Sequence, residues 1–144
     1  MPDTPQTYAN HGRFHPLFHF VLAPILLINL IVSIVWLVRN PGFASVWYLV
    51  MAVALFVMGT LVRVNPMKVQ DRVIRLEERL RLYALLPESQ RARIPELTED
   101  QLVGLRFAPD EELPALAQRA ISEHLTRKDI KKSIVNWRPD HWRV

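Results

Sequence analysis

Three histidines near the start of the chain have the spacing closest to that of a chemical site. His11, His15 and His19 lie four residues apart, so on one continuous helix they would line one face. Neutral imidazoles arranged in this way can hold a metal ion or a haem iron. Gly12 and Pro16 argue against a continuous helix there, and no carboxylate accompanies the three histidines. The alternative is that they solvate the entry of a membrane helix, and we expect no bound metal or other cofactor.

Other residue types that could support catalysis are not arranged for it. The chain has no cysteine, which removes thiolate zinc sites and cysteine nucleophiles. Ser122, His124 and Asp129 are the residue types of a catalytic triad, but no nucleophile-elbow glycine pattern surrounds the serine. The adjacent acids Glu77–Glu78 and Glu111–Glu112 would not face each other on a helix. The sequence therefore predicts a protein that is not an enzyme.

Two long apolar segments dominate the first half of the chain. Leu17–Val38 has 22 residues and Val46–Val62 has 17, and neither carries a formal charge. As helices they would be about 33 Å and 26 Å long, close to the hydrocarbon core of about 30 Å. The sequence Asn-Pro-Gly at 40–42 is typical of a turn, and Pro24 predicts a mild kink near His19–Phe20. We expect an antiparallel transmembrane hairpin over residues 17–64, preceded by a polar tail at 1–16.

The charges that flank the two segments predict their orientation. One Lys or Arg precedes the first segment and one lies in the loop, whereas six lie within residues 63–82. The positive-inside rule then places the C-terminal side in the cytoplasm. With two spans, both termini are expected to be cytoplasmic.

Polar and small residues within the two segments indicate how the helices pack. Asn29 lies at the middle of the first span, and Ser33 lies one turn further along. Ser45, Ala52 and Gly59 repeat every seven residues and form a small-residue seam on the second helix. Our hypothesis is that Asn29 makes a hydrogen bond across or near this seam, within the hairpin or between copies. The alternative is that Asn29 lines a transport pathway.

A second amphipathic pattern follows the hairpin. Asn65-Pro66 is expected to end or bend the second helix, with a new helix over Met67–Leu86. Its apolar residues have the 4-3-4-3 spacing of a short coiled coil or a packed hairpin: Val69, Val73, Leu76, Leu80 and Tyr83. A neighbouring basic stripe is predicted to contact lipid headgroups or an acidic partner: Lys68, Arg72, Arg75 and Arg79. The alternative is a solvated face in which Glu77 pairs with Arg81.

The remaining sequence predicts short helices with clear start signals. Thr98-x-x-Gln101 and Thr126-x-x-Asp129 resemble capping boxes, and Glu111–Glu112 is expected in the first turn of a further helix. Trp137 and Trp142 are predicted to contact lipid or a partner. We therefore expect an all-α protein in which a small cytoplasmic helical domain occupies residues 65–144. Its basic residues are interrupted by acids, which disfavours nucleic-acid binding.

Four segments of the sequence are distinctive as a set. They are Asn10-His-Gly-Arg-Phe-His-Pro-Leu-Phe-His-Phe20, Gln70-Asp-Arg-Val-Ile-Arg-Leu-Glu-Glu-Arg-Leu80, the Arg-Phe-Ala-Pro-Asp-Glu-Glu-Leu core of Leu97–Leu116, and Ile130-Lys-Lys-Ser-Ile134 followed by Trp137-Arg-Pro-Asp140. Together they resemble an uncharacterised family of small bacterial membrane proteins with two spans and a charged C-terminal region. The resemblance implies the bacterial inner membrane and no active-site residue.

The function expected from the sequence is that of a membrane-anchored interaction protein or an accessory subunit of a larger membrane complex. Its expected partners are the lipid bilayer and other membrane protein subunits or copies of itself. A homo-oligomeric channel or transport assembly is the alternative, and a histidine-ligated metal or haem protein is a third.

Overall fold

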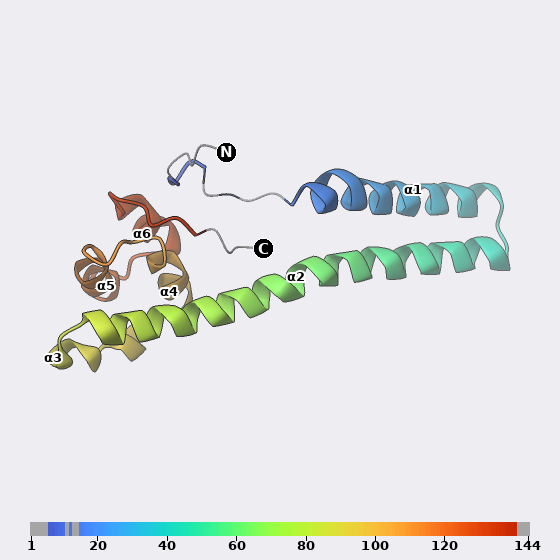
Figure 1. Ribbon diagram of the computed structural model, residues 1–144. Coiled ribbons are helices and arrows are strands. Elements are labelled where there is room, and N and C mark those ends of the chain that lie inside the picture. Colours follow the sequence, from blue (N-terminus) through green and yellow to red (C-terminus); the bar gives the residue numbers. More distant parts are fainter. Residues whose placement is uncertain (1–5, 11, 13–14, 141–144) are drawn as a thin grey trace. The chain divides into compact units, whose positions relative to one another are not determined.

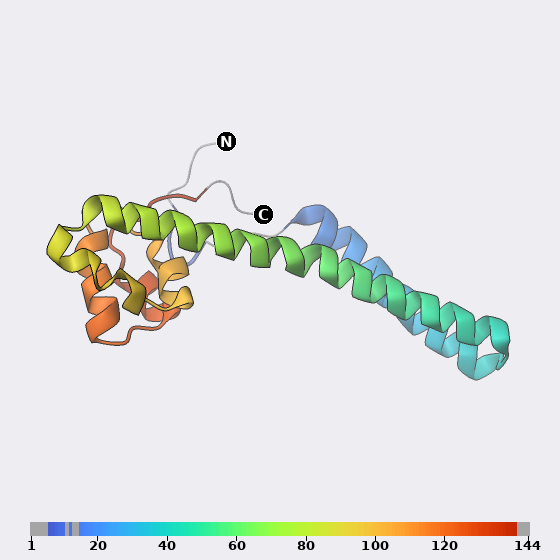
Figure 2. The ribbon, with the colours of Figure 1, turned by 90° about the horizontal axis from the view of Figure 1, so that it is seen from below.

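A computed structural model describes residues 6–10, 12 and 15–140, and within these ranges it contains only helices, turns and loops (Figures 1 and 2). The prediction of an all-α protein is therefore confirmed for the described part of the chain. The described residues form two compact units, one comprising 15–68 and the other 69–140 with 6–10 and 12. The elements in chain order are the π-helical turn η1 (Leu17–Leu22), α1 (Ala23–Arg39), α2 (Phe43–Leu85), α3 (Glu88–Arg91), the 3-10 turn η2 (Ile94–Glu96), α4 (Glu99–Leu105), α5 (Leu113–Ser122) and α6 (Arg127–Ser133).

The first unit is a helical hairpin. α1 and the first part of α2 run side by side in opposite directions, as both ribbon views show. The helices Leu17–Arg39 and Phe43–Leu85 are both long and apolar enough to cross a membrane. Most large apolar side chains of the hairpin point outward, including Ile28, Val38 and Val62, each more than half exposed.

The residues before Pro24, where the sequence predicts a mild kink, form a π-helical turn. Proline has no backbone N–H, so Pro24 cannot donate to the carbonyl oxygen of Phe20, and its ring crowds that carbonyl. The backbone N–H of Ala23 instead donates to the carbonyl oxygen of Phe18, five residues back. Such local widening satisfies backbone groups near proline without ending the helix.

The second helix does not end at Asn65–Pro66. α2 continues through Pro66 to Leu85, so the separate helix predicted over Met67–Leu86 is the C-terminal part of α2. Pro66 removes the hydrogen bond to the carbonyl of Val62, a loss that breaks many helices. Both residues are exposed, and the helix continues on either side of the missing hydrogen bond.

The second unit packs the end of α2 against the short helices that follow. α4 contacts both α5 and α6, and Leu82 of α2 and Leu86, the residue that follows α2, belong to the core. The largest fully buried side chains come from α2, α4, α5, α6 and the segment after α4: Phe107, Leu82, Leu102, Leu105, Leu113 and Ile130. The unit therefore has a core of its own.

Both predicted capping boxes are confirmed. The backbone N–H of Gln101 donates to Thr98 Oγ1 over 3.2 Å, and the N–H of Thr98 donates to Gln101 Oε1 over 2.9 Å. Thr126 and Asp129 make the same reciprocal pair at the start of α6. These bonds satisfy donors that a helix start otherwise leaves without partners.

The expected start of the next helix at Glu111–Glu112 is wrong. α5 begins at Leu113, and Glu112 lies just before it. The Glu112 carboxylate accepts hydrogen bonds from the backbone N–H groups of Val135 and Asn136 at 3.0 and 2.9 Å. It therefore holds the C-terminal segment rather than balancing a helix dipole.

Candidate functional site

The histidines predicted as metal candidates make local contacts where the structure describes them. His11 lies outside the described residues. His15 and His19 are one helical turn apart, and the Nδ1 atom of His19 lies 2.9 Å from the carbonyl oxygen of His15. Among the described residues no three or more His, Cys, Asp or Glu side chains form a group suited to a metal ion.

The small residues of the hairpin lie where α1 meets α2. Ser33, Ser45 and Ala52 are all buried. Ser45 Oγ donates to the loop carbonyls of Asn40 and Gly42 at 2.6 and 2.9 Å, so it caps the turn. The side chain of Leu26 fills the space that a Cβ at Gly59 would need. The seam predicted at Ser45, Ala52 and Gly59 is thus a close-packed face within the hairpin.

Asn29 has a different place from these small residues. Its side chain is exposed, and it borders a shallow groove that Ala52 and Tyr48 also line. Its backbone carbonyl accepts a hydrogen bond from Ser33 Oγ at 2.8 Å. Within the described part of the chain the structure gives its side-chain amide no hydrogen bond across the seam. A bond from Asn29 to another copy stays a hypothesis.

The predicted basic stripe is divided between two roles. Arg75 is half-buried and forms an ion pair with Glu99 of α4, and its Nε donates to the carbonyl of Asp71. Lys68, Arg72 and Arg79 are exposed and make no ion pair with the residues that the structure describes. Of the four basic residues of the stripe, these three present a charge to a lipid or a partner that no ion pair within the described residues neutralises.

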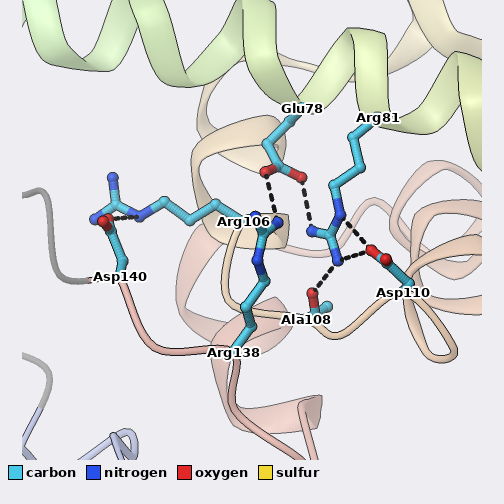
Figure 3. Close-up of polar contacts among 7 residues, drawn as sticks. All are labelled: Glu78, Arg81, Arg106, Ala108, Asp110, Arg138 and Asp140. Atoms are coloured by element: carbon cyan, nitrogen blue, oxygen red, sulfur yellow. Dashed lines mark hydrogen bonds and ion pairs between the residues drawn. The ribbon is translucent and has the colours of Figure 1, made fainter.

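A charged cleft in the second unit lies beside the buried face of α2 (Figure 3). Its volume is about 700 Å³, and Glu78 is its most buried acid, with 4 % of its surface exposed. Arg81 Nη1 lies 3.2 Å from one Glu78 oxygen, and Arg138 Nη1 lies 3.9 Å from the other. Arg81 also donates to Asp110 over 2.6 Å and to the carbonyl of Ala108 over 2.7 Å. The pair Glu77–Arg81, considered from sequence, is therefore replaced by Glu78 and Asp110.

The far side of the cleft is formed by the last described segment. Arg106 Nε lies 3.4 Å from Asp140 Oδ2, and its guanidinium stacks over the ring of Phe107. The ring of Trp137 packs against Phe107 with 4.9 Å between ring centroids. Trp137, predicted to contact lipid or a partner, thus packs against the unit's own core. Trp142 lies outside the described residues.

The ionisation of Glu78 is shifted by its position. Burial raises the pKa of Glu78, and the nearby guanidiniums of Arg81 and Arg138 offset only part of this effect. The cleft is lined by three carboxylates and three guanidiniums: Glu77, Glu78, Asp140, Arg81, Arg106 and Arg138. Glu78 pairs with Arg81 and Arg138, and Asp140 pairs with Arg106, whereas Glu77 has no ion pair within the described residues. Chemically, this arrangement is suited to joining α2 to the C-terminal segment. The sequence pattern that could have indicated this cleft is the position of Glu78, midway between Ile74 and Leu82 on one helix face.

The opposite face of α2 carries the main exposed apolar feature of the second unit. We call it the outer stripe, and its five side chains are each 48–62 % exposed: Val69, Val73, Leu76, Leu80 and Tyr83. At 3.6 residues per turn this stripe lies roughly opposite Ile74, Glu78 and Leu82, which are buried. The packing seam that this spacing indicates stays a prediction, because the unit's own core uses the other face of α2.

These observations define an all-helical protein in which a hairpin with two candidate membrane spans continues into a small helical unit. The chain belongs to a family of unknown function, DUF6526, whose model matches residues 1–144. Searches of curated proteins and of solved structures gave no match.

Proposed function

We propose that this chain is a membrane-anchored, non-enzymatic interaction protein or an accessory subunit of a larger membrane complex. The hairpin holds the chain in the bilayer, and the helical unit offers a docking surface. The observation that carries the proposal is the outer stripe, because its five exposed apolar side chains face away from the unit's own core. Contiguous apolar surface of this kind marks sites of protein or membrane interaction.

The outward-facing apolar side chains of the hairpin support the membrane anchor. In water they would expose a large apolar area, whereas in a bilayer they would contact lipid tails. Trp36, Trp47 and Tyr48 are exposed close to the loop, where aromatic rings favour the membrane interface. The proposal includes a bacterial inner membrane with both termini cytoplasmic, on the basis of the basic residues that follow the second apolar segment.

The charged cleft supports a structural rather than a catalytic role for its ionisable groups. Arg81 is held by Glu78, Asp110 and the carbonyl of Ala108, and Glu78 is shared with Arg138. A general base or acid needs a geometry that leaves it able to reach a substrate. Here the polar atoms are directed at one another.

The proposal is tested by site-specific photo-crosslinking of the full chain in cells. A photoreactive residue replaces Leu76 in the outer stripe, and in a matched control it replaces Ser89, an exposed polar residue of α3. We expect the chain in the membrane fraction after carbonate washing, and a discrete crosslinked polypeptide from position 76 but not from 89. A chain released by carbonate would overturn the membrane anchor, and equal or absent crosslinking at the two positions would overturn the docking surface.

A further inference from the structure

The spacing of the outer stripe and the charges beside it indicate which partner binds there. We propose that its occupant is a second copy of this chain, and that two α2 helices pair over residues 69–83 as a parallel two-stranded coiled coil. This inference rests on the proposed function and names the partner at the same surface.

The spacing of the stripe assigns a heptad register. Val73 and Leu80 take the first position of successive heptads, and Val69, Leu76 and Tyr83 take the fourth. These are the two positions whose side chains interdigitate between helices in a coiled coil. A Val at the first position followed by a Leu at the fourth, as in Val73 and Leu76, suits a two-stranded parallel coil.

The charges beside the stripe favour a second copy in parallel orientation. In this register Arg72 takes the seventh position of one heptad and Glu77 takes the fifth position of the next. In a parallel pair these two positions face each other across the seam, so Arg72 of each chain meets Glu77 of the other, twice by symmetry. Both side chains are exposed, and neither has an ion pair within the part of the chain that the structure describes.

An antiparallel pair would place like charges together. Seventh positions then face seventh positions, so Arg72 would meet Arg79 or Arg79 would meet its own counterpart. Like charges at such sites destabilise a helix pair. The same charges that support a parallel pair therefore oppose its reversal.

The fold leaves this face available without rearrangement. Ile74, Glu78 and Leu82 face the core of the same chain, so pairing through the outer stripe leaves their contacts among the described residues in place. Val73 and Glu77 also border the charged cleft, which lies at the edge of the outer stripe. Two heptads alone form a weak coiled coil. Chains held in one membrane share an orientation and a raised effective concentration, and both favour the parallel pair.

Cysteine crosslinking tests the pairing in the intact chain. Because the chain has no cysteine, each variant carries one thiol: Val69→Cys, Leu76→Cys or Tyr83→Cys, with Lys68→Cys as the control next to the stripe. The full chains are reconstituted into vesicles of phosphatidylethanolamine and phosphatidylglycerol and then oxidised. Disulfides need Cα atoms about 4.4–6.8 Å apart, so we expect covalent dimers at 69, 76 and 83 and few at 68.

The pattern of dimers decides the orientation. Dimers at 76 alone would indicate an antiparallel crossing and overturn the parallel pair. No excess of dimers at any stripe position over Lys68→Cys would overturn self-pairing.

A charge exchange tests the register. In the Leu76→Cys background, Arg72→Glu or Glu77→Arg alone should lower the dimer yield about threefold or more, because each places like charges across the seam. The double exchange should restore the yield, which a merely destabilised unit would not show. Failure of the double exchange to restore dimers would overturn the register.

These results are separable from failure of the proposed function. If the photoreactive residue at position 76 captures only a different polypeptide in the membrane, docking stands and self-pairing falls. If carbonate releases the chain from membranes but the cysteine dimers form, self-pairing stands and the membrane anchor falls.

Discussion

The substitution Gln101→Glu separates what the sequence pattern predicts from what the structure predicts. Glu is a preferred third residue of a capping box, so the local pattern Thr98-x-x-Glu predicts equal or greater stability. The structure predicts the opposite. Gln101 is buried, and its Nε2 atom donates to the carbonyl oxygens of Ala120 and Leu125 over 2.8 and 3.1 Å.

The expected loss follows from these two hydrogen bonds. A carboxylate keeps the bond accepted from the Thr98 N–H but cannot donate to Ala120 or Leu125. Each lost bond costs about 1 kcal/mol net, and a buried carboxylate facing two carbonyl oxygens adds a further desolvation penalty, for a total of about 3 kcal/mol. Protonation of the introduced carboxyl returns one donor, so the loss should be smaller at low pH and grow as the pH rises.

Hydrogen exchange of the full chain in detergent micelles measures this loss locally. Peptides that cover α4 and α5 should exchange about a hundredfold faster in Gln101→Glu, which is the rate equivalent of about 3 kcal/mol. Gln118→Glu makes the same change at an exposed position of α5 and should leave exchange unchanged. If Gln101→Glu protects these peptides as well as the native residue does, the link between α4 and α5 does not stabilise the unit.

Three further substitutions test other parts of the fold. Burial raises the pKa of Glu78, so its contribution to stability is greatest below the unfolded-state pKa and is lost as the pH rises through the folded-state pKa. In urea unfolding, the stability of the native chain relative to Glu78→Gln should therefore fall as the pH rises, and a constant difference would contradict the shift. Gly59→Leu should lower the thermal stability of the hairpin in detergent by about 1–3 kcal/mol because Leu26 already fills that space, whereas Gly42→Ala, with no neighbour within 4 Å, should not. His124 has a φ of 50°, so His124→Gly should stabilise the unit by about 1 kcal/mol in a thermal melt while His124→Ala does not.

The features predicted correctly from the sequence are those that depend on neighbours along the chain. Thr98 and Thr126 find their capping partners three residues away, so the pattern alone is sufficient. The start of α5 at Leu113 was predicted too early because Glu112 is held by Val135 and Asn136, and no local pattern reveals a partner more than twenty residues away. The role of Glu78 was missed for the same reason, since Arg138 lies sixty residues further along.

α2 shows why the apolar period alone could not assign its faces. The outer stripe has the cleaner 4-3-4-3 pattern, yet the face packed on the core includes Glu78. That carboxylate is tolerated because Arg81 and Arg138 pair with it, and the backbone N–H of Arg138 is held by the carbonyl of Phe107 at 2.8 Å. Pairing of a buried charge depends on tertiary contacts, which a periodicity does not contain.

The contrast between the two faces of α2 supports a binding role for the outer stripe. The second unit completes its core with Leu82 and Leu86, so it gains no core packing from large apolar side chains on the other face. Five such side chains at coiled-coil spacing expose apolar surface to water, which works against solubility. Arg72 and Glu77 beside them lie where a parallel second copy would pair with both. Exposed apolar residues with no binding role would not be expected to have flanking charges that match their spacing. The charge exchange at Arg72 and Glu77 tests directly whether these charges contribute to pairing.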